Sequence, residues 1–165
     1  MNSRQVVLRT VTRLTPATRW YPLRRALLAA QGFDVHPTAQ VTASACFLIR
    51  DVSIGAESFV GHHFQVYGGS ASRLTIGERC AVGPDVRVFA GTHEMADSRC
   101  RAGAARSTEV TVEDGCWIGG GAVLVGPCRI GAGSVVAAGA IVRADVPPNS
   151  LYFGPRATDL RPLRP

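Results

Sequence analysis

The sequence contains four histidines, and one of them stands where proton transfer would be useful. His93 lies in the segment Val-Phe-Ala-Gly-Thr-His-Glu, immediately before a stretch of the chain that has no hydrophobic period. A neutral imidazole, with an ordinary pKa of about 6.5, can accept a proton near neutral pH. We therefore take His93 as a candidate general base, with a hydrogen-bonded surface histidine as the alternative.

The cysteines give no sign of a metal or redox centre. The chain has five of them, an odd number, and no two form a C-x-x-C pair. The histidines also lack the His-x-x-x-x-His spacing typical of a zinc site within short coils, so we expect no metal. Unpaired thiols fit a reducing compartment. Because the longest apolar stretch near the start, residues 26–30, is far shorter than a membrane span, we expect a cytoplasmic protein.

The basic residues restrict the chemistry further. All 18 are arginine, which excludes a catalytic lysine, a Schiff base and a phosphate-loop lysine. A net charge of +6 favours an anionic partner, such as a phosphorylated small molecule. The arginines form no continuous basic run and have no interleaved aromatic residues, so we expect no nucleic-acid binding.

An internal repeat indicates the elements that must position these residues. From residue 54 onward an aliphatic residue recurs every six positions within four blocks, and a second residue, small in most cases, stands four positions after each. The aliphatic positions are Ile54, Val60, Val66, Ile76, Val82, Val88, Val112, Ile118, Leu124, Ile130, Val136 and Val142. The second set is Ser58, Phe64, Ser70, Cys80, Val86, Thr92, Cys116, Ala122, Cys128, Ser134, Ala140 and Val146.

A period of six fits a short strand plus a turn, repeated, and fits neither an amphipathic helix nor simple strand alternation. Three such units close a triangular coil, and stacked coils place the aliphatic residues in a ladder along the interior. An earlier coil is predicted at Val35, Val41 and Phe47, with a slip of one residue before the next. Cys80, Cys116 and Cys128 then act as compact core residues, while the exposure of Cys100 stays open.

Two breaks interrupt the register, and insertions in a solenoid must loop outward. The shorter break covers residues 68–75. The longer one, residues 94–111, carries Arg99, Arg101 and Arg106 and has no hydrophobic period. We expect it to be extruded as an unstructured lid or binding loop, with plain surface disorder as the alternative.

A helix is predicted over residues 18–31, with Thr18 as the N-cap and Gly32 as the stop. We favour a cap on the open end of the coils, or a contact with a neighbouring subunit, over a basic helix on a membrane surface. The predicted organisation is a helical capping segment at 1–34, a β-helix at 35–157 and a tail at 158–165.

The pattern resembles the hexapeptide-repeat acyltransferases, in particular the maltose, galactoside and nodulation-factor O-acetyltransferases. The matching segments are Thr92-His93, then Val-Glu-Asp-Gly-Cys-Trp-Ile-Gly-Gly-Gly at 112–121, and Ile-Gly-Ala-Gly-Ser-Val-Val-Ala-Ala-Gly-Ala-Ile-Val-Arg-Ala-Asp-Val-Pro-Pro-Asn at 130–149. The resemblance implies a single-stranded left-handed parallel β-helix. It also implies transfer of an acyl group from acetyl-CoA, or another acyl-CoA, to a hydroxyl of a sugar-like acceptor. A homotrimer with its active sites between subunits is implied in the same way.

The same resemblance implies roles for individual residues. His93 would be the general base. Trp117 would flank the pantetheine arm, with the backbone amides of Gly119 and Gly120 near the thioester. The remaining positions that match CoA contacts of the family are Ala138, Arg143 and Arg156. Galactoside-type members bind the sugar through an asparagine where this chain has His63, so His63 and its neighbour His62 are either acceptor-binding or ordinary surface residues.

Two other functions remain open at this point. A γ-class carbonic anhydrase uses the same kind of helix, but its zinc site needs three convergent histidines. A non-catalytic β-helix scaffold is the second alternative, and Thr92, His93, Trp117 and the arginines together argue against it.

Overall fold

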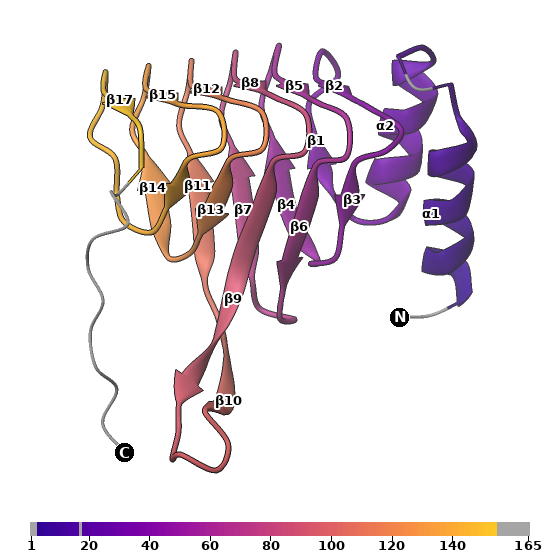
Figure 1. The fold of residues 1–165 in the computed structure, drawn as a ribbon. Helices are drawn as coiled ribbons and strands as arrows, with labels where there is room; N and C mark the ends of the chain where they lie inside the picture. Colours follow the sequence, from indigo (N-terminus) through magenta and orange to yellow (C-terminus); the bar gives the residue numbers. More distant parts are fainter. Residues whose placement is uncertain (1–2, 17, 155–165) are drawn as a thin grey trace.

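The computed structural model describes residues 3–16 and 18–154, which form a three-sided parallel β-helix with two helices at one end (Figure 1). The helices are α1 (Ser3–Leu14) and α2 (Tyr21–Ala30). Sheet A contains β1 (Asp34–Val35), β4 (Asp51–Ile54), β7 (Arg73–Ile76), β11 (Glu109–Val112) and β14 (Cys128–Ile130), in that order. Sheet B contains β2 (Gln40–Val41), β5 (Phe59–Val60), β8 (Ala81–Val82), β12 (Trp117–Ile118), β15 (Val135–Val136) and β17 (Leu151–Tyr152).

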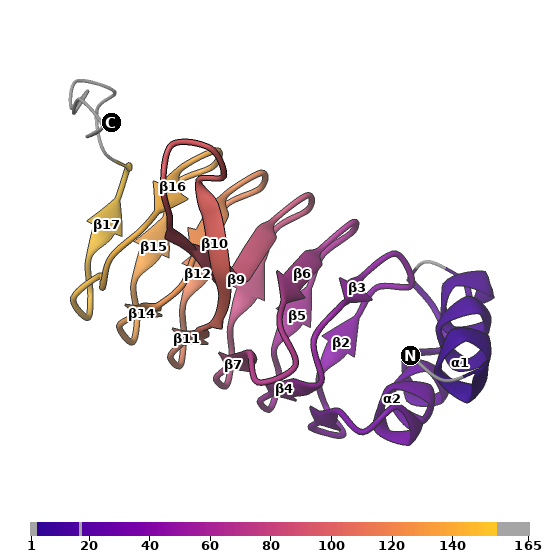
Figure 2. The ribbon, with the colours of Figure 1, turned by 90° about the horizontal axis from the view of Figure 1, so that it is seen from below.

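Sheet C completes the prism. It contains β3 (Cys46–Phe47), β6 (Gln65–Gly68), β9 (Arg87–Met95), β13 (Val123–Val125) and β16 (Ile141–Val142), with β10 (Ala102–Ser107) paired to β9 alone. The chain passes from A to B to C and returns to A one rung further along (Figure 2). The predicted parallel β-helix with a short N-terminal helical segment is therefore confirmed.

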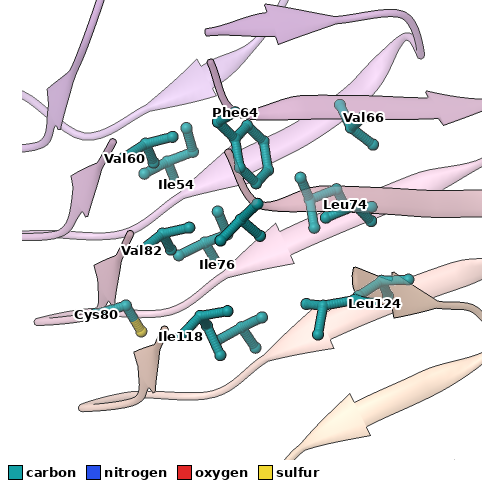
Figure 3. Close-up of a cluster of buried hydrophobic side chains, with 14 of the residues drawn as sticks. Ile54, Val60, Phe64, Val66, Leu74, Ile76, Cys80, Val82, Ile118 and Leu124 are labelled. Carbon is teal, nitrogen blue, oxygen red and sulfur yellow. The ribbon is translucent and has the colours of Figure 1, made fainter. Parts of the chain in front are cut away.

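The sixfold register is confirmed by the strand pairing. Ile54 pairs with Ile76, Val82 with Ile118, and Leu124 with Val142, so equivalent positions stack directly on one another. The weaker first coil is present as well, since Val35 pairs with Ile54 and Phe47 with Val66. All of these side chains except Val35 are buried, and Figure 3 shows the central ones pointing into the prism.

The second set of repeat positions is buried except at two places. Phe64 is buried and stacks on Phe47, with ring centroids 5.7 Å apart. Ser70 and Thr92, by contrast, are exposed, so the prediction of inward positions there is wrong. Ser70 lies inside the first break and Thr92 stands just before the second, so at both positions the chain is leaving the coil. The inward small residue within the first break is Ser72 instead.

The cysteine predictions can be compared directly with the structure. Cys80, Cys116 and Cys128 are buried in the core, as predicted, and Cys100 is exposed. Burial raises the pKa of Cys128 to about 11, which keeps this thiol protonated at neutral pH. Cys128 therefore packs as an apolar side chain, whereas the buried thiols of Cys80 and Cys116 donate to the carbonyl oxygens of Glu113 and Gly131 at 3.0 and 3.2 Å.

The long break is not an unstructured loop. Strand β9 continues past the corner of the prism and turns back as β10, which pairs with it in antiparallel fashion (Figure 1). The paired residues include His93 with Ala105 and Thr92 with Arg106. Backbone hydrogen bonds between the two strands give this extrusion a defined shape, which the missing hydrophobic period concealed.

The N-terminal segment also differs from its prediction. The helix begins at Tyr21, its N-cap is Trp20 with φ 59°, and no side chain caps it, so Thr18 is not the N-cap. A second helix, α1, precedes it and packs against it. Helix α2 contacts β1 and β2, and Leu28 joins the hydrophobic core. The expected cap on the open end of the coils is therefore formed by α2.

Candidate active site

His93 lies on the hairpin, and its ring is held by the facing strand. Its Nδ1 atom is 2.9 Å from the carbonyl oxygen of Gly103. Because a carbonyl oxygen can only accept, Nδ1 carries the proton in this hydrogen bond. In the neutral ring Nε2 then keeps its lone pair, and the exposed side chain can present it to a substrate. This tautomer is the one that a general base requires.

A cavity of about 280 Å³ lies beside His93, where the two breaks in the register meet. The end of β6 and the start of the first break contribute Tyr67, Gly68 and Gly69, and the hairpin contributes the rest. These hairpin residues are Gly91, Thr92, His93, Ala105, Arg106 and Ser107. Both segments leave the prism at the same corner, between sheet C and sheet A. An imidazole, hydroxyls and a guanidinium thus border one hollow.

Close backbone contacts hold these two segments together. The Ser72 hydroxyl donates to the Ala90 carbonyl and accepts from the Gly69 amide at 2.8 Å. The Tyr67 ring, which lines the cavity, stacks on the Phe89 ring with centroids 5.4 Å apart. A Cβ atom on Gly91 would lie 3.1 Å from the Cα of Gly68, so a side chain at Gly91 would push the segments apart.

The residues matched to CoA contacts form a separate group on sheet B and the corner after it. Trp117 lies on β12 and is 59% exposed. Gly119 follows at the corner, where a Cβ would lie only 2.5 Å from the backbone nitrogen of Ala138 on the next coil. The Gly120 carbonyl accepts from the Gly139 amide at 2.9 Å. The structure therefore brings Trp117, Gly119, Gly120 and Ala138 onto two adjacent rungs.

Three of the residues matched to CoA contacts, Gly119, Arg143 and Arg156, differ from this group in what they can offer to the donor. The Gly119 amide donates to the Val136 carbonyl at 2.8 Å, so it is not available to a thioester, whereas Gly120 remains a candidate. Arg143 is exposed just after β16, beyond sheet C. Arg156 lies outside the described residues. Trp117 and His93 lie on different sheets of the prism, B and C.

His62 and His63 border a different cavity, of about 630 Å³, at the corner between sheets B and C. The Nδ1 atom of His63 is 3.3 Å from Oδ1 of Asp85, and that of His62 is 3.4 Å from the Ser44 hydroxyl. Ser44 also accepts from the His63 amide at 3.0 Å. The two histidines are therefore tied to neighbouring coils, and His93 does not line their cavity.

Sequence reasoning missed part of the cavity beside His93. Tyr67 and Ser107 were not singled out, because they come from segments about 40 positions apart that only the stacking of coils brings together. The Gly68-Gly69 pair at the first break was the available signal. Within the part of the chain that the structure describes, no three His, Cys, Asp or Glu side chains are grouped so that they could hold a metal ion.

Part of the chain matches a known protein family, and known acetyltransferases and related proteins are similar to it in sequence. Residues 109–144 match the family described as bacterial transferase hexapeptide (six repeats). The chain is 33% identical to the galactoside O-acetyltransferase of Lactococcus lactis over 49% of its own length and 39% of that protein. It is 30% identical to the bifunctional protein GlmU of Thermotoga maritima over 73% of its length and 31% of the relative. The chain therefore spans well under two thirds of either relative.

Solved structures agree with this result. A hexapeptide-repeat acetyltransferase of Vibrio cholerae, complexed with acetyl-CoA, superposes with a TM-score of 0.71 at 26% identity, covering 90% of this chain and 79% of that one. A galactoside acetyltransferase in complex with CoA has the same fold, with a TM-score of 0.68 and 20% identity over 90% and 73% of the two chains. The predicted resemblance to hexapeptide-repeat acetyltransferases is confirmed.

Proposed function

We propose that this hexapeptide-repeat chain is an acyl-CoA-dependent O-acyltransferase that uses acetyl-CoA and acts on a hydroxyl of a sugar or sugar-containing acceptor. The observation that carries the proposal is the tautomer of His93, fixed by Gly103, with Nε2 available beside a cavity that Thr92, Arg106 and Ser107 also line. The neighbour complexed with acetyl-CoA supports the choice of donor.

In the proposed reaction, Nε2 of His93 takes the proton of the acceptor hydroxyl while its oxygen attacks the thioester carbonyl carbon. The new C–O bond gives a tetrahedral oxyanion, and collapse of this intermediate breaks the C–S bond. His93 then returns the proton to the leaving thiolate, which yields the ester and free CoA. Gly103 stabilises the imidazolium that forms between these steps, because its carbonyl accepts the Nδ1 proton throughout.

The donor would lie along the second group of residues. Trp117 would offer its exposed ring to the pantetheine arm. Gly120 and Ala138 have no side chain and a methyl group respectively, so the arm could approach the backbone at this corner. Arg143 and Arg156 would supply fixed positive charge for the phosphates. Because Trp117 and His93 lie on different sheets, the proposal pairs His93 of one subunit with the donor-binding residues of the next. It therefore includes a homotrimer. The proposal also takes the coil to be left-handed, as in such proteins. It places the protein in the cytoplasm, because acetyl-CoA is found there and because free cysteines fit a reducing compartment.

The proposal is tested by following release of free thiol from acetyl-CoA with a panel of sugars. The His93→Ala variant is expected to lose about 10² to 10⁴-fold in kcat, the usual contribution of a general base. Its KM for acetyl-CoA should stay close to the wild-type value. The matched control is His36→Ala, since His36 is an exposed histidine whose ring Nδ1 bonds to Thr38, two residues along the chain. Equal turnover by wild type and His93→Ala would refute the assigned mechanism.

A further inference from the structure

The net charge of the chain is concentrated in its first 33 residues. This segment contains six of the 18 arginines and none of the 12 acidic residues. The remaining 132 residues carry 12 arginines and 12 acidic residues, so their formal charges cancel. The whole formal charge of +6 therefore belongs to the segment that contains α1 and α2.

The same segment exposes apolar side chains in a helical pattern. Val7, Val11 and Leu14 stand at positions i, i+4 and i+7 of α1, which places them along one face of the helix. All three are exposed, and Leu14 is 79% exposed. Trp20 and Leu23, beside the connection between the helices, are exposed as well. Helix α1 contacts α2 through other positions, since Thr12 is buried.

One arginine of the segment is already used inside the protein. Arg24 is buried against backbone carbonyls and cannot contact a partner. The other five arginines still contribute to the potential around the helices, and this potential extends over about 8 Å at physiological ionic strength. The surface at this end of the molecule thus combines an apolar stripe with a strong positive field.

We propose that the helical hairpin formed by α1 and α2 docks on an anionic lipid surface, with Val7, Val11 and Leu14 entering the headgroup boundary. An apolar helix face with surrounding basic residues is the pattern that lies in the membrane interface. Trp20 fits the same location, because an indole ring has an apolar body and one polar N–H. Among the described residues no helix is long and apolar enough to cross a membrane, so the contact is peripheral.

The charge decides between this partner and two others. A second copy of the chain would bring another hairpin of net charge +6 against the first, with no acidic residue in either segment to offset the repulsion. A nucleic acid would satisfy the charge but would leave the apolar stripe in water. An anionic lipid surface satisfies both features. The inference does not depend on the proposed reaction, and its test does not use activity.

The test is flotation of the full chain with vesicles of phosphatidylcholine alone and with vesicles that also contain phosphatidylglycerol, at low and high salt. Binding is expected to be strong only on the anionic vesicles, and to weaken with salt. The Val11→Glu/Leu14→Glu variant should lose about tenfold or more in the partition coefficient. Arg9→Gln/Arg13→Gln should lose about fivefold for each arginine on the anionic vesicles. Phe153→Glu is the matched control, since Phe153 is 74% exposed beyond the other end of the coils, and it should bind as the wild type does.

Tryptophan fluorescence gives a second measurement that does not rely on the folding of the Val11→Glu/Leu14→Glu variant. The chain has two tryptophans, so in a Trp117→Phe background the emission comes from Trp20 alone. This emission should shift to shorter wavelength on addition of the anionic vesicles and not with the neutral ones. The proposal is overturned if wild type binds both vesicle types equally or not at all, or if Val11→Glu/Leu14→Glu binds normally. It is also overturned if that variant abolishes self-association measured by sedimentation while vesicle binding persists.

Discussion

The fold places a guanidinium in its interior, and this gives the sharpest test of how the helices are attached. Arg24 is 1% exposed and donates to the carbonyl oxygens of Val41, Pro16 and Arg19 and to the hydroxyl of Thr15. No carboxylate takes part in these bonds. Burial lowers the pKa of Arg24, and the Tyr21 ring, 5.3 Å from the guanidinium carbon, opposes that shift. Since Val41 belongs to β2, this one side chain joins the connection between the helices to the first coil.

The Arg24→Met substitution keeps most of the volume and removes every donor. A buried acceptor left without a partner costs about 1 to 3 kcal/mol. Val41 is buried and should be near the middle of that range, while water can reach the carbonyls of Pro16 and Arg19, which should be near its lower end. The Thr15 hydroxyl keeps its bond to Thr12 at 2.7 Å. We therefore expect the helices to be destabilised by about 4 kcal/mol.

Hydrogen exchange of the α2 amides measures this local loss directly, whereas a single global transition is not assured in a repeat protein. Arg24→Lys should recover only part of it, because an ammonium cannot reproduce the planar fork of donors. The matched control is Arg25→Met, at the next position, which removes one bond of 3.4 Å to Ala39 and should change the exchange by less than about 0.5 kcal/mol. Indistinguishable protection factors for Arg24→Met and Arg25→Met would refute the reasoning.

Three further outcomes are expected. Gly119→Ala brings a Cβ within 2.5 Å of the Ala138 nitrogen and should lower the free energy of unfolding, measured in urea, by about 2 kcal/mol or more. In the control Gly139→Ala the new Cβ meets nothing within 4 Å, and only the φ of +70° should cost about 1 kcal/mol. Equal losses in the two variants would contradict the contact. The Arg129 guanidinium, followed by the Ala132 amide, holds the pKa of Glu113 below its ordinary value of 4.5. The ionised carboxylate stabilises the fold at pH values above its ordinary pKa, and this contribution is lost as the pH falls through the lowered pKa of the folded state. Glu113→Gln should therefore show a smaller fall of Tm at acid pH than the wild type. Parallel curves of Tm against pH for the two proteins would exclude this role. Replacing residues 92–107 by a short turn should leave the circular dichroism of the β-helix intact and abolish thiol release, and retained turnover would remove the hairpin from the site.

The repeat could be predicted because its sixfold spacing links residues that are close together in the sequence. Each buried rung position follows from its neighbours six residues away, as at Val82 and Val88. The errors at Ser70 and Thr92 have one cause. Both stand where the chain leaves the coil, and beyond that point the register is set again by pairing with the neighbouring rung, such as Arg73 with Asp51, which counting along the chain cannot reveal.

Other features depended on contacts that a sequence does not display. The residues of β10 are mostly alanine and glycine, and they form a strand only because β9 offers a free edge. Arg24 was not expected in the interior because charged side chains are seldom buried, and its acceptors are backbone carbonyls that any sequence contains. For the site, the position of His93 was predictable, while its bond to Gly103 and the contribution of the first break required the folded hairpin.

Both insertions leave the prism at one corner, and the pairing of sheet A continues past them without interruption. Arg73 pairs with Asp51 on one side and with Glu109 on the other, although the two insertions separate these residues in the chain. Lengthening such a segment costs little, since closure entropy rises by only about 0.6 kcal/mol for each doubling of loop length. Over evolutionary time the chain could therefore change the lining of the cavity beside His93 by exchanging a few residues at this corner, with every rung of the scaffold left as it is.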